Sequence, residues 1–233
     1  MITYSIVIPT YPPHIQYLSN ILKQINNFDK NDKYSIIEII IALSQINNTE
    51  AAELQQDLQS KTVYSVYVLP TIAKCNAAIN RNRGWDNAKA DWIVFLDADD
   101  IYNQKKLSIT TDLIDTYPDI NGIVHSYCRK KNVPHNIDFS TCELSLPKKI
   151  RDHTYPNGYT DPPLPEQVHN GKTNINAGNR SPVSHGILTV RKTFPIHYDA
   201  RYTTGEDGVL CRYICASEGG LLFTSAPLMI YTS

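Results

Sequence analysis

Three carboxylates follow a short apolar run in the stretch WIVFLDADD, where Asp97, Asp99 and Asp100 come directly after residues 92–96. Like charges this close repel one another and raise one another's pKa unless a positive group lies among them. Carboxylates at positions i and i+2 after a strand are suitable ligands for Mg²⁺ or Mn²⁺. The alternative is an N-cap at the positive end of a helix, which accounts for one or two acids but not for a third. The stretch therefore predicts a divalent cation at Asp97 and Asp99.

A second acidic pair, Glu206-Asp207, stands in TGEDGVLCRYI at the expected start of a helix. A carboxylate at this place can serve as a general base, which must reach the proton that it abstracts. Acids in the first turn of a helix are also ordinary partners of the helix dipole. The pair alone leaves both interpretations open.

Three further side chains are candidates for ligand binding. Arg81, in NRNRG, can hold a phosphate or a base edge through two hydrogen bonds, or it can be a solvated helix residue. Tyr11, in IPTYPP, can stack on a nucleobase, or it can be a core aromatic whose hydroxyl is satisfied. His185, in SHGILTVRK, is one of seven histidines and stays only a candidate, because a lone histidine is more often structural.

Apolar runs alternate with helical patterns over the first hundred residues, and these elements must position the candidate side chains. The β-branched runs predict strands, and the periodicity between them predicts helices. The expected strands are 4–8, 36–43, 62–69 and 92–96, and the expected helices are 12–25, 51–58 and 73–89. The alternation predicts an α/β, Rossmann-like fold, a mostly parallel sheet with helices on both faces. Ligands of such sheets gather at the carboxyl ends of the strands, where Tyr11 and Asp97 stand.

The second half of the chain is less regular. Residues 130–183 hold several prolines, many asparagines and little periodicity, and a loop of this length is uncommon inside a compact domain unless it is functional. We interpret it as an irregular lobe that covers one side of the site. The other expected elements are a helix at 107–117, a strand at 122–128, a strand at 185–192, a helix at 205–220 and two short strands at 221–225 and 227–231. We expect one domain over 1–233, with halves 1–128 and 129–233.

Composition excludes several classes of protein. The 233 residues include 22 Lys and Arg against 23 Asp and Glu, so no global field recruits nucleic acid or an anionic membrane. The amino terminus lacks the pattern of a signal peptide, and no apolar run approaches the roughly 18 residues of a membrane span. The five cysteines are odd in number and include no CxxC pair, so reduced thiols and a cytoplasmic location are expected.

Five motifs in their order along the chain resemble those of the family-2 glycosyltransferases of GT-A fold. They are SIVIPTY, NRNRG, WIVFLDADD, SHGILTVRK and GEDGVLCRYI. The resemblance covers residues 3–128 and 183–232, and the ordered set is far more specific than any single motif. It implies a metal-assisted, inverting transfer of a sugar from a nucleoside diphosphate sugar, most often a UDP-sugar, to an acceptor hydroxyl. The acceptor would be a glycan, a lipid or a protein.

The resemblance also implies a role for each candidate residue. The donor would be bound by Pro9, Thr10, Tyr11, Arg81, Asp97, Ala98 and Asp99. Within that set, the residues of IPTY would hold the base, Asp97 would approach the ribose, and Asp99 would be the main ligand of Mn²⁺ or Mg²⁺ between the phosphates. Asp207 would be the general base, with Glu206 beside it shaping the acceptor site. The irregular lobe and His185 would lie on the acceptor side.

Two positions depart from the pattern of the family. Members often carry an acid after the second strand to read the base, whereas this place reads IALSQ (41–45), so that Ser44 or a backbone group would substitute. Many members also carry a histidine beyond the last strand that completes metal coordination, whereas no histidine follows His197. Water or another histidine such as His185 would fill that position, or the chain is a fragment of a longer protein.

Two other functions stay open. FLDADDIY also resembles the nucleophile motif of haloacid-dehalogenase-type phosphohydrolases. Those enzymes usually carry the motif near the chain start and a second acidic pair after another apolar strand, whereas Glu206-Asp207 opens a helix. The other alternative is an inactive module that binds sugar nucleotides, against which both acidic pairs argue.

Overall fold

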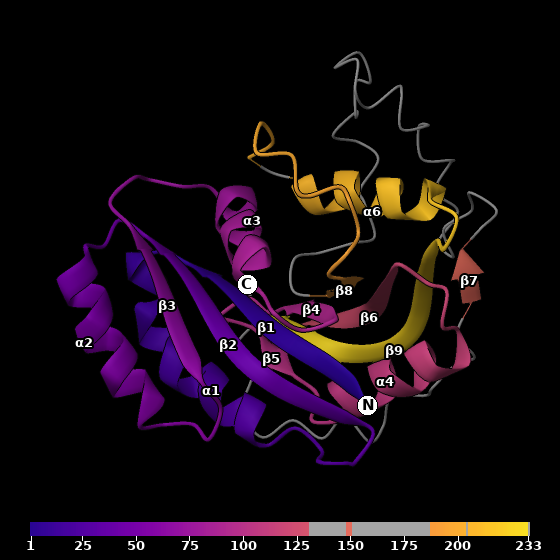
Figure 1. Cartoon of the computed structure of the whole chain (residues 1–233), viewed down its shortest axis with the longest axis horizontal. Coiled ribbons are helices and arrows are strands. Elements are labelled where there is room, and N and C mark those ends of the chain that lie inside the picture. The colour runs from indigo at the N-terminus through magenta and orange to yellow at the C-terminus, as the bar shows by residue number, and fades with distance from the viewer. Residues whose placement is uncertain (131–147, 151–186, 204, 233) are drawn as a thin grey trace.

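The computed structural model describes residues 1–130, 148–150, 187–203 and 205–232, and its first half alternates strands with helices (Figure 1). The strands are β1 (Ile2–Thr10), β2 (Tyr34–Ser44), β3 (Val66–Thr71) and β4 (Trp92–Phe95). The helices are the 3-10 helix η1 (Pro12–Tyr17), α1 (Leu18–Asn26), α2 (Asn48–Gln59) and α3 (Ala77–Asn87). Every element expected here exists. The third strand starts later than predicted, at Val66, and the helix expected from 73 starts at Ala77.

The second half contains β5 (Ile101–Tyr102), α4 (Lys106–Thr116), β6 (Gly122–Lys130), β7 (Lys148–Ile150), β8 (Leu188–Arg191), α6 (Glu206–Ala216) and β9 (Leu221–Thr232). The prediction of two short strands at the end was wrong, because β9 is one strand. The short β5 was not predicted. Apart from Lys130 and β7, the lobe expected at 130–183 lies outside the described residues, as does His185.

The strands that are described form one sheet of nine, in the order β3-β2-β1-β4-β8-β6-β9-β5, with β7 paired to β9. The longer pairings, β1 with β2, β2 with β3, β1 with β4 and β6 with β9, are parallel. The shorter pairings of β8, β5 and β7 are antiparallel. The expectation of a mostly parallel sheet is confirmed, with β8 as an antiparallel strand in its middle.

Helices cover both faces of the sheet, as the alternation predicted (Figure 1). Successive side chains of β1 point to opposite faces of the sheet, so Tyr4 and Val7, three positions apart, lie on opposite faces. Val7 faces α3 at Gly84, where an added Cβ would lie 2.3 Å from Val7 Cγ1. Tyr4 faces α4, where its hydroxyl lies 2.9 Å from Thr111 Oγ1. The central strands are therefore buried on both sides, which explains their continuous β-branched sequences.

The edge strand β3 is protected by side chains of α2. An unpaired edge exposes backbone groups that can template pairing with another chain. Gln59 Oε1 accepts from the backbone N–H of Val66, and Gln55 Oε1 accepts from that of Val68, both over 2.9 Å. These amides occupy two donors of the outer edge. Among the residues placed by the structure, no helix is both long and apolar enough to cross a membrane.

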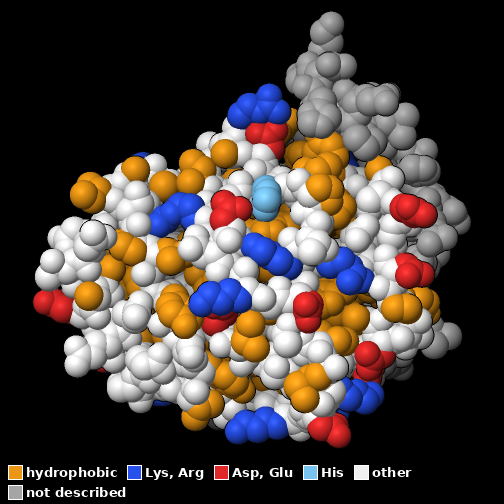
Figure 2. Space-filling model, in the orientation of Figure 1, with side chains coloured by type: hydrophobic (Ala, Val, Ile, Leu, Met, Phe, Trp, Pro, Cys, Tyr) orange, Lys and Arg blue, Asp and Glu red, His pale blue; other side chains and the backbone are white. Residues whose placement is uncertain are grey.

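The sheet brings two of the predicted motifs to one edge. Because β1 and β4 are parallel neighbours with Val7 opposite Phe95, their carboxyl ends lie side by side. Thr10 ends the first strand and Tyr11 follows it, while Asp97 comes just after the other strand. On the face shown in Figure 2, basic and acidic side chains are interspersed, in agreement with the formal net charge of -1.

Candidate active site

The three carboxylates after β4 lie in a turn, residues 97–100, which we call the aspartate turn. The hydroxyl of the buried Tyr102 accepts from the backbone N–H of Asp97 over 2.6 Å and donates to the carbonyl of the same residue over 3.4 Å. Asp100 N–H donates to the carbonyl of Asp97 over 3.3 Å. Within the described stretch 97–105 no helix begins, since β5 follows directly and α4 starts at Lys106. The helix-cap interpretation of these acids is therefore wrong.

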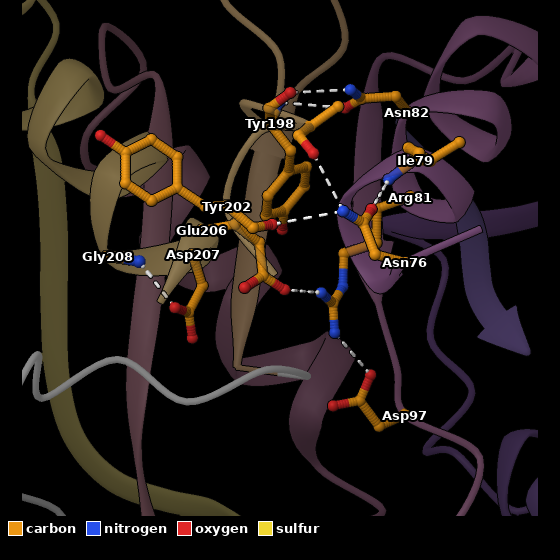
Figure 3. Close-up of polar contacts among 11 residues, drawn as sticks. Asn76, Ile79, Arg81, Asn82, Asp97, Tyr198, Tyr202, Glu206, Asp207 and Gly208 are labelled. Atoms are coloured by element: carbon orange, nitrogen blue, oxygen red, sulfur yellow. Dashed lines mark hydrogen bonds and ion pairs between the residues drawn. The ribbon is translucent and has the colours of Figure 1, made fainter. Parts of the chain in front are cut away.

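Arg81 lies between Asp97 of the aspartate turn and Glu206 of the second acidic pair (Figure 3). Its Nη2 donates to Asp97 Oδ1 over 2.9 Å, and its Nη1 donates to Glu206 Oε1 over 2.8 Å. The side chain is only 2% exposed, so the interpretation of Arg81 as a solvated helix residue is wrong. Part of the positive charge that the aspartate turn requires thus comes from the protein itself.

The surroundings of Arg81 keep its guanidinium charged. Burial by itself lowers the pKa of an arginine, because it penalises the charged form. Asp97, Glu206 and Asp207 raise the pKa of Arg81 further than burial lowers it, with a contribution from Tyr198, so the net shift is upward. The ring of Tyr198 also lies against the guanidinium, with its centroid 5.5 Å from Arg81 Cζ. A permanent cation at this place offsets the negative charge that Asp97 and Glu206 bring to the site.

The second acidic pair begins α6. Gly205, before the helix, has φ of +77°, a left-handed conformation that glycine adopts without the steric cost of a side chain. Glu206 is buried against Arg81, and Asp207 is 4% exposed, with Oδ1 accepting from Gly208 N–H over 2.7 Å. The pair does lie in the first turn, as ordinary dipole partners do, but Glu206 also makes a tertiary ion pair. The capping interpretation is therefore incomplete.

The end of β1 presents an exposed aromatic group. Tyr11 is 42% exposed, so its interpretation as a core aromatic is wrong. Its ring centroid lies 4.2 Å from that of His14 in η1, and His14 in turn contacts Tyr17 edge to face. Thr10 is buried and Pro9 is half-buried. An exposed ring at the carboxyl edge of a parallel sheet can stack on a flat ligand.

His14 was missed from the sequence. It follows Pro12-Pro13 in a six-residue helix without buried residues, so no pattern distinguishes it from a surface residue. The structure places it within electrostatic reach of Asp99, since the charge of His14 lowers the pKa of that carboxyl. Tyr11, His14 and Asp99 thus belong to one neighbourhood.

Asn80 of α3 links the ends of the first two strands. Its Nδ2 donates to the carbonyl of Thr10 over 3.1 Å and to Ser44 Oγ over 3.4 Å. Ser44 is buried at the end of β2, the place where the resemblance leads one to expect an acid. A signal for Asn80 was present in the sequence, because α3 contains three asparagines although asparagine is a poor helix former.

The aspartate turn offers two carboxylates to a divalent cation. Burial, the first cause, raises the pKa of Asp99, and the neighbouring Asp97 raises it too, while a backbone hydrogen bond and His14 lower it; the net shift is upward. A cation would favour the ionised form of Asp99. No group of three or more His, Cys, Asp or Glu in the described ranges forms a complete metal site. Mg²⁺ is commonly held by one or two carboxylates together with substrate phosphates, and the two acids fit that arrangement.

Solved structures include a similar fold in S. aureus TarS. The crystal structure of TarS 1–349 matches with a TM-score of 0.65 at 12% identity, covering 99% of this chain and 60% of that chain. TarS 1–349 in complex with UDP-GlcNAc matches with a TM-score of 0.65 at 12% identity, covering 99% of this chain and 58% of that chain. The structure of S. aureus TarS matches with a TM-score of 0.62 at 12% identity, covering 99% of this chain and 37% of that chain. This likeness confirms the expected GT-A fold, and the chain spans about 60% of the length of TarS 1–349.

No curated protein matches the sequence. The sequence model described as glycosyl transferase family 2 matches residues 5–172, more than half of the chain. The match includes the strand end at Tyr11, the helix that carries Arg81 and the aspartate turn. The resemblance drawn from the ordered motifs is confirmed by this match, and the chain belongs to glycosyl transferase family 2.

Proposed function

We propose that the chain transfers a sugar from a UDP-sugar to a hydroxyl of a glycan, lipid or protein acceptor, with inversion at the anomeric carbon. Membership of glycosyl transferase family 2 supports the reaction class. The nucleotide is suggested by TarS, whose crystal structures include complexes with UDP-GlcNAc and with UDP.

The observation that carries the proposal is the pair of bonds made by Arg81. Its guanidinium ties Asp97, on the donor side, to Glu206, which precedes Asp207 in the first turn of α6. A transferase must hold the donor and the acceptor hydroxyl against each other, and positioning of this kind supplies much of the lowering of the barrier. A phosphohydrolase has no need of an acidic helix start at the same place, so the geometry favours transfer.

On the donor side, the exposed ring of Tyr11 stacks on the base, and the buried Thr10 and Ser44 sit where the base edge comes to lie, with Pro9 and Ala98 lining the same strand ends. Asp97 receives the ribose. Asp99, with Asp97, is the protein's ligand set for Mn²⁺ or Mg²⁺. When bound, such a cation neutralises negative charge that builds up on the leaving diphosphate.

On the acceptor side, Asp207 is the general base. It takes the proton of the acceptor hydroxyl while the oxygen forms its bond to the anomeric carbon. The bond from that carbon to the phosphate oxygen breaks, and its electron pair leaves with the nucleoside diphosphate. One displacement from the opposite face inverts the configuration.

The proposal is tested by thermal shift with UDP, UDP-sugars and control nucleotides, each with and without Mn²⁺. A ligand of the native state raises the apparent melting temperature, so a UDP-sugar should raise it, and more so with the cation. The native protein is then assayed for release of UDP from the UDP-sugar that binds. Asp207→Asn should reduce that release by about 10²–10⁴-fold while UDP still binds.

Three results contradict the proposal. If no uridine nucleotide raises the melting temperature, the donor assignment is wrong. If donors bind but neither transfer nor hydrolysis occurs with any acceptor class, the chain is the inactive binding module. Release of inorganic phosphate from phosphomonoesters through an aspartyl phosphate would establish the phosphohydrolase instead.

A further inference from the structure

The segment that leads into α6 is held on α3 by asparagine side chains (Figure 3). Asn82 binds the backbone of Tyr198 through both ends of its amide, a contact that we call the Asn82–Tyr198 clamp. Its Nδ2 donates to the carbonyl over 2.8 Å, and its Oδ1 accepts from the N–H over 2.9 Å. Asn76, which caps α3, donates through Nδ2 to the carbonyl of Ala200 over 2.9 Å and more weakly to that of Tyr202 over 3.4 Å. The segment before α6 is thus attached to α3 at several backbone groups.

Tyr198 adds a packed anchor to these hydrogen bonds. Its side chain is buried, and its ring meets that of Phe95 in β4 edge to face, with centroids 5.2 Å apart. The ring also lies against the guanidinium of Arg81 and, edge to face, against the ring of Trp85, whose centroid is 6.4 Å away. Tyr198 therefore occupies a fixed place between α3 and the strand that ends in the aspartate turn.

Two consecutive residues of α3 fix the two ends of the segment. Asn82 holds Tyr198, and Arg81 holds Glu206 while also holding Asp97. Consecutive residues on one helix are rigidly related, so the distance between these two anchors is set by α3 itself. Asp207 is the next residue after the second anchor, and its position relative to Asp97 follows from the same helix.

We propose that Asn82 and Glu206 are positioning residues for sugar transfer: α3 uses the Asn82–Tyr198 clamp and the Arg81–Glu206 ion pair to place Asp207 against the donor. The inference rests on the proposed function and deepens it. Glu206 directs one oxygen to Arg81, so it acts through the position of α6, and proton transfer belongs to Asp207 alone. Displacement of a reacting group by about 1 Å can cost on the order of 10²-fold in rate.

The first test is Asn82→Ala with transfer and donor binding measured separately. The kcat should fall about 10–100-fold, since the base is displaced, while the Kd for UDP measured by titration calorimetry should change less than about twofold. The matched control is Asn87→Ala on the same helix, because Asn87 Nδ2 donates to the carbonyl of Arg83 within α3. This control should leave kcat and Kd unchanged.

Hydrogen exchange tests the clamp without reference to activity. The Tyr198 amide donates to Asn82, so a peptide containing residue 198 should exchange faster in Asn82→Ala than in the native protein or in Asn87→Ala. Unchanged exchange would show that the clamp is not closed in solution and would overturn the inference. Faster exchange with native kcat, measured well below the melting temperature, would make the clamp purely structural and would overturn it equally.

Glu206→Gln covers the case in which Asn82→Ala does not fold. Glutamine keeps the shape of the side chain but loses its charge, so the contact with Arg81 weakens and kcat should fall. The acidic limb of the pH profile of kcat should stay, because Asp207 remains. Loss of that limb in Glu206→Gln would identify Glu206 as the base and overturn its positioning role. If the native protein binds no uridine nucleotide and transfers no sugar, the proposed function itself fails. If the native protein transfers sugar and the variants do so equally well, only the positioning role fails.

Discussion

Arg81 donates to Glu206 over 2.8 Å although 125 positions separate the two residues, and both are almost completely buried, with 2% and 1% exposure. A buried pair of this kind gives little net stability compared with apolar residues, but removing one partner leaves a charge without compensation. Here the guanidinium of Arg81 also forms an ion pair with Asp97. The arrangement makes the fold around the site depend on one side chain.

Arg81→Met is therefore expected to destabilise the protein strongly. It leaves the carboxylates of Asp97 and Glu206 near each other without the cation, and the free energy of unfolding should fall by about 3–5 kcal/mol. Urea denaturation measures the change. The control is Arg201→Met, which breaks the exposed ion pair with Asp199 and should change stability little. Equal effects of the two variants would contradict the role assigned to Arg81.

Tyr102→Phe tests the support of the aspartate turn. The variant keeps the buried ring but removes the hydroxyl that accepts from Asp97 N–H. An unsatisfied buried donor costs about 1–3 kcal/mol, so the free energy of unfolding should fall by that amount. Tyr67→Phe is the control, because Tyr67 lies 40% exposed on β3. A loss in Tyr102→Phe no greater than that in Tyr67→Phe would show that the hydroxyl does not hold the turn.

Much of the fold could be predicted because its signals are local. The run IIEIIIAL (36–43) is buried on both faces from Glu38 onward, and its apolar content identifies a central strand. The end of the chain was misjudged for an equally local reason. Pro227 interrupts two apolar runs and lacks an N–H, which predicts a break, yet β9 continues through it opposite Ser126, where the register of the pairing shifts.

The candidate site was predictable residue by residue but not as an arrangement. The acids were found because like charges after an apolar strand are unusual. The partner of Asp97 could not be found in this way, because the contact with Arg81 exists only once β4 and α3 are packed. The Asn82 clamp was missed for the same reason, since its partner is a backbone group 116 positions away. The sequence carries no trace of which backbone group an amide will meet.

Gly84→Ala tests the close packing of α3 on β1. The added methyl would meet Val7 Cγ1 at 2.3 Å, and Val7 is fully buried in a central strand with no room to shift. Overpacking of this kind costs about 1–3 kcal/mol, which thermal or urea unfolding will show. Val7→Ala in the same chain removes the clashing group, so the double variant should lose less than the sum of the single losses. Additive losses would contradict the contact.

Lys106→Met tests a buried amine beneath the site. Lys106 of α4 is fully buried, with Nζ bonded to His125 Nε2 and lying 5.5 Å from the ring centroid of Tyr102. Burial lowers the pKa of Lys106 to about 7, whereas a lysine in the unfolded chain has a pKa of about 10.4. Between these values the unfolded chain binds more protons than the folded protein. The contribution of Lys106 to the free energy of unfolding therefore increases with pH over this window, by at most about 1.4 kcal/mol per pH unit.

Below pH 7 Lys106 is charged in both states, so its contribution no longer changes with pH. Urea denaturation of the native protein and of Lys106→Met at pH 6, 7, 8 and 9 isolates the effect of Lys106 together with its contact to His125, because the other titrating groups contribute equally to both slopes. The difference between the two slopes should be near zero below pH 7 and positive above it. Lys23→Met, at an exposed position of α1, should follow the native slope throughout. Parallel curves for native protein and Lys106→Met at every pH would mean that the amine keeps its ordinary pKa despite its burial.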